Sequence, residues 1–111
     1  MGADIYIKTK RKLPPKYDKY LCGEEYYFRD SYNLTNLAWV IKLSYWNDFV
    51  KNPVEFLKRL ANISDEQIEK YVESKNLSND EKNELIEILK SKRDYIKEIV
   101  KAGILNIEYS I

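Results

Sequence analysis

The chain has 111 residues, of which 44% are hydrophobic and 33% are charged, with only 3 Gly and 3 Pro. This composition is typical of one globular, helix-rich domain, residues 1–111, and it excludes a disordered chain. The net charge of +1 excludes a strong overall attraction to nucleic acid or to a membrane surface.

Residue usage also limits the possible chemistry. The absence of histidine excludes Ser-His-Asp and Cys-His machinery and the HExxH zinc motif. The single cysteine, Cys22, excludes an intramolecular disulfide and suits a reducing compartment. Carboxylate-bound magnesium stays formally open, but Asp4, Asp30 and Asp48 have no spacing that identifies a site, and we expect no cofactor and no metal. The first residues form no apolar signal region, which favours a cytoplasmic protein without membrane contact.

Two segments alternate between apolar and polar residues, as strands do. Residues 3–9 place Ile5 and Ile7 on one face, and residues 104–110 alternate in the same way. Residues 10–32 contain two adjacent prolines and have no regular period, which predicts a long loop.

Four helices are expected between these strands. The first has Asn33 or Thr35 as its cap, and its buried face is expected to be the stripe Trp39, Leu43, Trp46 and Val50. The other three begin after the caps Asn52, Ser64 and Ser78, and the two serines open capping boxes. Gly103 fits the position just past the last helix. The expected helices cover residues 34–50, 53–61, 65–75 and 79–102.

These elements predict an α+β fold that is mostly helical, with four helices packed on a small sheet formed by the N- and C-terminal strands. An isolated two-stranded ribbon is marginal in water. The sheet therefore needs the helices as a cover, a third strand from residues 10–31, or pairing of edge strands in a homodimer.

The segment Tyr26–Asn33 crowds rings, an arginine and a carboxylate into eight residues. In a binding role, Arg29 would hold a carboxylate or phosphate while the rings stack on a base or fill a partner's pocket. In a structural role, Arg29 and Asp30 would pair and fix the loop while the rings pack on the following helix. The candidate binding residues are Tyr27, Phe28, Arg29, Asp30, Tyr32 and Asn33.

Two further groups allow alternative interpretations. A basic segment could contact phosphates or an acidic partner, or could simply be solvated; it consists of Lys8, Lys10, Arg11 and Lys12. A second group of rings could line a pocket for a planar ligand, although indoles at helical spacing are more often core; it consists of Tyr32, Trp39, Tyr45 and Trp46.

Three motifs carry a resemblance to a family. Residues Gly2–Tyr6, Tyr27–Asn33 and Leu43–Trp46 resemble small uncharacterised phage and prophage proteins with the motifs GAD[IL]Y, YFRDSYN and LSWW. The resemblance covers roughly residues 2–49, and Tyr45 stands where the family motif has its first Trp. It implies a viral source, and hence the cytoplasm of a host cell, but no particular mechanism.

The sequence as a whole favours a non-enzymatic accessory protein that binds a host protein or ribonucleoprotein stoichiometrically. Its most specific form is an inhibitor of a CRISPR or other defence system. The alternative is a nucleotide- or phosphate-binding protein, or a weak enzyme without histidine, centred on Arg29 and Asp30 with Tyr32 and Asp4. Direct contact with nucleic acid is open but not favoured, and the protein is expected to be a monomer or a homodimer.

Overall fold

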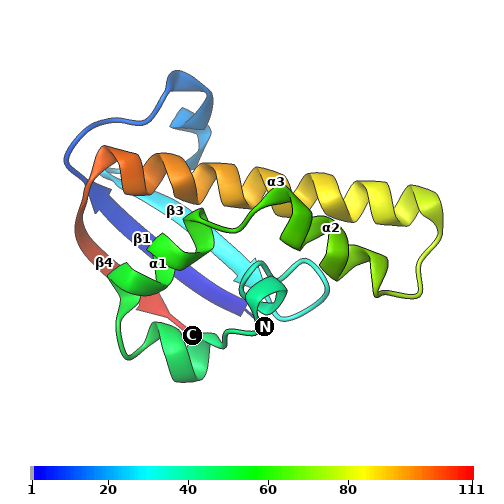
Figure 1. The fold of residues 1–111 in the computed structure, drawn as a ribbon. Coiled ribbons are helices and arrows are strands. Elements are labelled where there is room, and N and C mark those ends of the chain that lie inside the picture. Colours follow the sequence, from blue (N-terminus) through cyan, green and yellow to red (C-terminus); the bar gives the residue numbers. More distant parts are fainter. Residues whose placement is uncertain (1) are drawn as a thin grey trace.

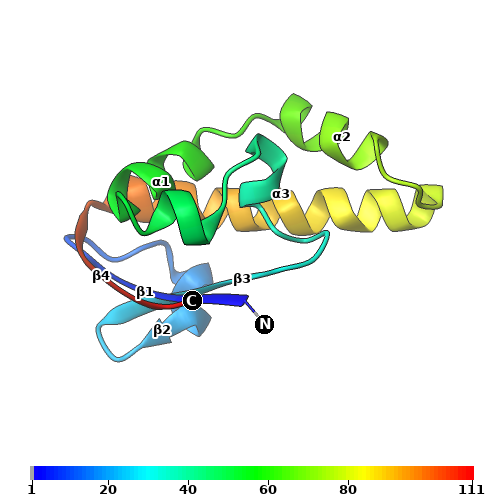
Figure 2. The same cartoon turned by 90° about the horizontal axis from the view of Figure 1, so that it is seen from below.

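In the computed structural model, which describes residues 2–111, helices cover one face of a four-stranded antiparallel sheet (Figures 1 and 2). The expected fold class is confirmed. The strands are β1 (Gly2–Thr9), β2 (Leu21–Cys22), β3 (Glu25–Ser31) and β4 (Ile104–Ser110). The α-helices are α1 (Pro53–Ala61), α2 (Asp65–Glu73) and α3 (Asn79–Ala102). Three shorter helical turns are η1 (Pro15–Tyr20), η2 (Ala38–Ile41) and η3 (Tyr45–Phe49).

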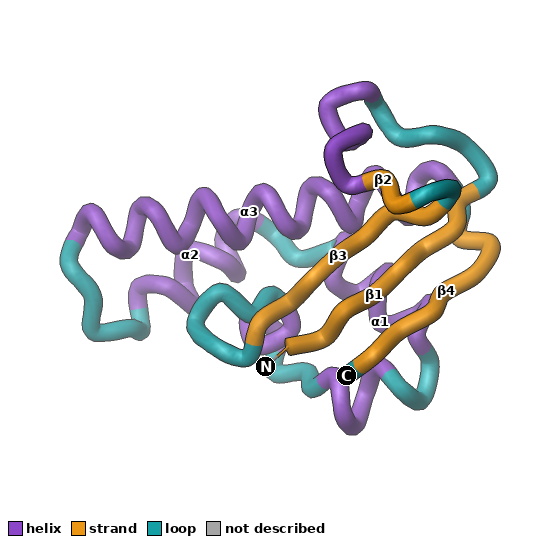
Figure 3. The backbone as a smooth tube through the Cα atoms, turned by 180° about the vertical axis from the view of Figure 1, so that it is seen from behind, coloured by secondary structure: helices purple, strands orange, loops and turns teal. Residues whose placement is uncertain are grey.

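The two terminal strands are neighbours in the sheet, as the sequence predicts. The strand order is β2-β3-β1-β4, and β1 pairs antiparallel with β3 on one side and with β4 on the other (Figure 3). Ile5 on β1 lies opposite Phe28 on β3 and opposite Tyr109 on β4.

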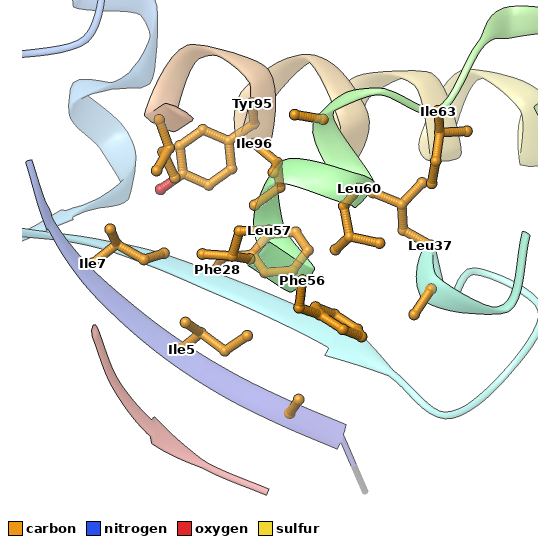
Figure 4. Close-up of a cluster of buried hydrophobic side chains, with 14 of the residues drawn as sticks. Ile5, Ile7, Phe28, Leu37, Phe56, Leu57, Leu60, Ile63, Tyr95 and Ile96 are labelled. Atoms are coloured by element: carbon orange, nitrogen blue, oxygen red, sulfur yellow. The ribbon is translucent and has the colours of Figure 1, made fainter. Parts of the chain in front are cut away.

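The core lies between the sheet and the helices. Ile5 and Ile7 of β1 and Phe28 of β3 are buried and face the helical layer, where they meet side chains such as Leu57 of α1 and Ile96 of α3 (Figure 4). This arrangement follows from the period-2 alternation of strands and the apolar stripes of the helices. Within residues 2–111, no helix lies over the opposite face of the sheet (Figure 2).

The prediction of a loop over residues 10–32 is wrong, because this segment contains η1, β2 and β3. The third strand comes from this segment, which was one of the options for completing the sheet. Aromatic residues stand on both faces of β3, as Tyr26 and Phe28 are buried while Tyr27 is half-buried. The contrast between apolar and polar positions that marks a strand is therefore missing from the sequence here.

The prediction of one helix over residues 34–50 is also wrong. The segment forms the two separate turns η2 and η3, and Lys42 between them has a left-handed backbone with φ of 58°. The stripe is not a buried face, since Trp39 is 40% exposed and Trp46 is 58% exposed. The carboxylate of Asp48 accepts a hydrogen bond from the Ser44 N–H at 2.8 Å. Such side-chain bonds to the backbone compete with the hydrogen bonds of a continuous helix.

The caps of the later helices are confirmed. Asn52 accepts from the N–H of Glu55, and Ser64 and Ser78 each form a complete capping box. Gly103 follows α3 with φ of 86°, a conformation that favours glycine. The helix expected over residues 65–75 ends two residues earlier, at Glu73.

The capping geometry predicts the effect of removing one hydroxyl. Ser78→Ala should lower the free energy of unfolding by about 0.5–2 kcal/mol, because the N–H of Glu81 loses its acceptor. Ser91→Ala is the matched control, since Ser91 is exposed within α3 and caps no helix. Urea denaturation of both variants measures the difference; equal stability of the two variants would contradict the assignment of Ser78 as a cap.

Candidate functional site

The strand β3 divides the cluster Tyr26–Asn33 between the two faces of the sheet. Phe28 and Asp30 are buried on the helical side, whereas Tyr27 and Arg29 alternate with them and lie on the opposite face. Because successive side chains of a strand point to opposite faces, Arg29 and Asp30 cannot meet the same small ligand. The cluster therefore consists of two separate sets of contacts, an inner arrangement around Asp30 and an outer one around Arg29.

Asp30 is the centre of the inner arrangement. Its carboxylate is fully buried and accepts hydrogen bonds from Lys92 Nζ at 3.0 Å, from the Tyr45 hydroxyl at 2.5 Å and from the Leu37 N–H at 2.9 Å. Lys92 also donates to the carbonyl oxygen of Thr35 at 2.6 Å. Asp30 thus joins β3 to the segment after it, to η3 and to α3.

The electrostatics of this arrangement follow from its burial. Burial raises the pKa of Asp30, while the charge of Lys92 and the hydrogen bond from Tyr45 lower it. Burial and the nearby charge of Asp30 raise the pKa of Tyr45 well above its ordinary value. The hydroxyl of Tyr32 is also buried and has no hydrogen-bond partner among residues 2–111. These features describe an internal structural contact in which the carboxylate of Asp30 is shielded from solvent.

Arg29 pairs with Asp4 and not with Asp30, so the predicted contact between neighbours is wrong. Arg29 Nη1 lies 2.7 Å from Asp4 Oδ1, directly across β1 and β3, and the Tyr27 hydroxyl donates to the same oxygen. The hydrogen bond from Tyr27, followed by that from Arg29, holds the pKa of Asp4 below its ordinary value. The rings of Tyr6 and Tyr27 lie 5.1 Å apart beside this pair.

The other residues of the predicted sites have local structural partners. The Asn33 side chain accepts from the N–H of Thr35 at 2.8 Å and closes a turn. In the basic segment, Lys8 pairs with Glu24 at 3.4 Å. The Arg11 guanidinium donates to the carbonyl oxygen of Lys101, in the last turn of α3 where a cation is favoured.

The backbone of Lys10 continues this contact. Its N–H donates to the carbonyl oxygen of Gly103 at 2.7 Å, while Lys12 is exposed. Through Lys10 and Arg11, the basic segment therefore connects the end of β1 to the end of α3.

A surface groove runs between η2 and α2, and we call it the η2–α2 groove. It consists of a hollow of about 630 Å³ and a second of about 450 Å³, which share the lining residues Val40, Lys42 and Gln67. Aromatic and aliphatic side chains, among them Trp39 and Tyr71, form the apolar part of the lining.

All the charged side chains of the η2–α2 groove are cationic. Of the described residues, no acidic one lines either hollow, and the cations are Lys42, Arg59, Lys70 and Lys75. The ammonium of Lys75 lies 4.5 Å from the centre of the Tyr71 ring. A ring and several cations without a counter-charge make a surface that favours anionic groups attached to an apolar or planar body.

The charges of α2 explain why the groove lacks acids. Asp65, Glu69 and Glu73 face α3, where they pair with Arg93 at 2.6 Å, Lys90 at 3.4 Å and Lys82 at 3.1 Å. The opposite side of the helix, which lines the groove, presents Gln67, Lys70, Tyr71 and Ser74. Spacings of three and four residues place this second set on one helix face.

Sequence reasoning missed this groove. Of the four rings expected to line a pocket for a planar ligand, only Trp39 lines the groove, since Tyr45 and Tyr32 lie beside Asp30 and Trp46 is exposed elsewhere. The sequence signal for the groove is that one face of α2 carries no acidic residue. The sequence does not show that this face lies opposite η2, because that depends on the tertiary fold.

Comparison with protein-family models, curated proteins and solved structures finds no match for the chain. Across residues 2–111, no three His, Cys, Asp or Glu side chains come close enough together to hold a metal ion. The same residues include no helix with the length and apolar character needed to cross a bilayer.

The two neighbouring residues of β3 should respond differently to substitution. Asp30→Asn should lower the free energy of unfolding by about 3–5 kcal/mol, because the partly buried ammonium of Lys92 loses its counter-charge. Arg29→Ala should change stability little, because its pair with Asp4 is open to solvent. Chemical denaturation measures both values, and a larger loss for Arg29→Ala than for Asp30→Asn would contradict this assignment.

Proposed function

We propose that the chain is a stoichiometric binding protein whose η2–α2 groove holds an anionic segment of a macromolecular partner. The observation that carries this proposal is the lining of the groove, which combines the exposed ring of Trp39 and the half-buried ring of Tyr71 with cations and no acid among the described residues. An acidic peptide segment with one apolar side chain fits this chemistry. Its apolar side chain would rest on Trp39 and its carboxylates would pair with Lys42 and Lys70.

The backbone at Lys42 supports a role for this groove in recognition. A left-handed conformation is unfavourable for lysine by roughly 1–2 kcal/mol, and such residues persist where the surrounding structure holds them. Here the N–H of Lys42 donates to the carbonyl oxygen of Trp39 at 3.1 Å, which closes the η2 turn. The turn orients both side chains toward the groove before a partner arrives, and this lowers the entropy lost on binding.

The resemblance to phage and prophage proteins supports a host factor as the partner. In this proposal the chain is an accessory protein that occupies an acidic face of a host protein or nucleoprotein. The most specific form is inhibition of a CRISPR or other defence complex, in which the chain would compete with a natural basic partner for that face.

The alternative of a nucleotide or phosphate site at Arg29 and Asp30 has less support. The two side chains lie on opposite faces of the sheet, and each already has a partner of opposite charge. The hollow beside Arg29 has a volume of about 220 Å³. Small-molecule sites usually measure about 300–1,000 Å³, so this hollow is small for a nucleotide.

Affinity capture from bacterial lysate tests the proposed surface. Trp39→Ala and Lys70→Glu should each reduce capture of the specific partner roughly tenfold or more, the loss expected for a hot-spot residue. Lys12→Glu is the matched control, because it makes the same charge change on the exposed basic segment. Quantitative mass spectrometry of the captured proteins measures the ratios. A partner that is retained by both groove variants and lost with Arg29→Ala would contradict the proposal.

A further inference from the structure

The two edges of the sheet differ in how far other parts of the chain cover them. The outer side of β3 is covered, because β2 pairs with its first residues and the Tyr95 hydroxyl donates to the carbonyl oxygen of Tyr27 at 2.8 Å. The ring of Tyr20 packs against that of Tyr95 with 4.6 Å between centroids. Such covering prevents an edge strand from pairing with another chain.

The outer side of β4 has no such cover (Figure 3). Within residues 2–111, β4 forms hydrogen bonds only through its ladder with β1. Leu105 is 55% exposed and Tyr109 is 45% exposed on this strand. Glu108 is its single charged residue, and the strand has no lysine or proline, the residues that usually block edge pairing.

The register determines which backbone groups of β4 face the open edge. In an antiparallel sheet, alternate residues direct their N–H and C=O groups to opposite neighbours. Because the carbonyl oxygen of Tyr27 bonds outside the sheet, Phe28 bonds to Ile5 on β1. Tyr6 then bonds to Glu108 on the other side of β1. The residues of β4 that direct N–H and C=O groups outward are therefore Ile107 and Tyr109, while a register shift opposite Lys8 and Thr9 ends the regular alternation at Leu105.

We propose that two copies of the chain form a homodimer by antiparallel pairing of β4 with β4, around a two-fold axis at Ile107. Ile107 is the midpoint of the strand, so this register pairs its whole length. The outward N–H and C=O groups of the two Ile107 residues satisfy each other, and Tyr109 lies opposite the partner subunit's Leu105. Glu108 lies opposite the partner subunit's Asn106, so no like charges meet. This self-complementarity favours a second copy over a foreign strand.

The helical side of the same edge also suits a second copy. The two-fold axis puts the helices of both copies on one face of a continuous sheet. The helical layer touches β4 through Phe49, whose ring lies 4.9 Å from that of Tyr109. The segment around Phe49 carries further exposed apolar side chains, which are Trp46, Val50 and Val54. The η2–α2 groove is lined by other elements and stays open in the dimer.

A set of charge variants tests both the dimer and its register. Asn106→Glu puts two carboxylates opposite each other at two places in the dimer and should raise the dissociation constant roughly tenfold. Glu108→Lys alone should leave the dimer intact.

Asn106→Glu combined with Glu108→Lys should restore the dimer, because each new carboxylate would then face an ammonium across the interface. In the monomer, Asn106 lies opposite Lys8, so a carboxylate introduced there does not disturb the fold. Asn76→Glu, in the exposed connection between α2 and α3, is the matched control.

Sedimentation over a range of concentrations measures the assembly, and circular dichroism verifies the fold of each variant. The expected result is a wild-type dimer, weakened by Asn106→Glu and restored by the double variant. A wild-type chain that stays monomeric up to millimolar concentration would overturn the proposal. A dimer that is indifferent to Asn106→Glu, or one that the second charge change does not restore, would overturn it as well.

Discussion

The contact between Asp30 and Lys92 is the interaction on which the rest of the structure depends. It joins β3 to α3 across 62 residues of sequence, and the same carboxylate also holds the Leu37 N–H and the Tyr45 hydroxyl. A buried ion pair often adds little net stability compared with apolar residues of similar volume. Its importance here lies in specificity, because one buried carboxylate accepts hydrogen bonds from three separate segments at once.

The hydrogen bonds of Asp30 also determine the path of the surface segment that contains η2 and η3. The carboxylate of Asp30 binds the Leu37 N–H just before η2, and its bond to the Tyr45 hydroxyl fixes η3. The segment between them therefore forms two short turns, and the left-handed residue Lys42 separates them. This path leaves Trp39 partly exposed beside α2 instead of burying it in a continuous helix. An internal ion pair thus shapes the η2–α2 groove that we propose as the binding surface.

The parts of the fold that could be predicted from sequence depend on neighbouring residues. The serine caps act over three residues, and the strands β1 and β4 alternate clearly. The strand β3 escapes prediction because rings lie on both of its faces. The expected helix over residues 34–50 does not form, and the carboxylates of Asp30 and Asp48 accept hydrogen bonds from backbone amides of this segment. The groove was missed because it joins elements that only the tertiary fold brings together. The ring-rich segment draws attention to Asp30 as a binding residue, whereas the structure gives it an internal contact with Lys92, which no pattern in the sequence marks.

Hydrogen exchange of the Leu37 amide, followed by NMR, tests the central claim most directly. The account predicts that this amide exchanges as slowly as amides of the central strand β1, because it donates to a buried carboxylate in a segment without regular secondary structure. It also predicts that Asp30→Asn accelerates exchange of Leu37 more than that of amides in the middle of α2. Rapid exchange of the Leu37 amide in the wild-type chain, at the rate of an open loop, would contradict the account.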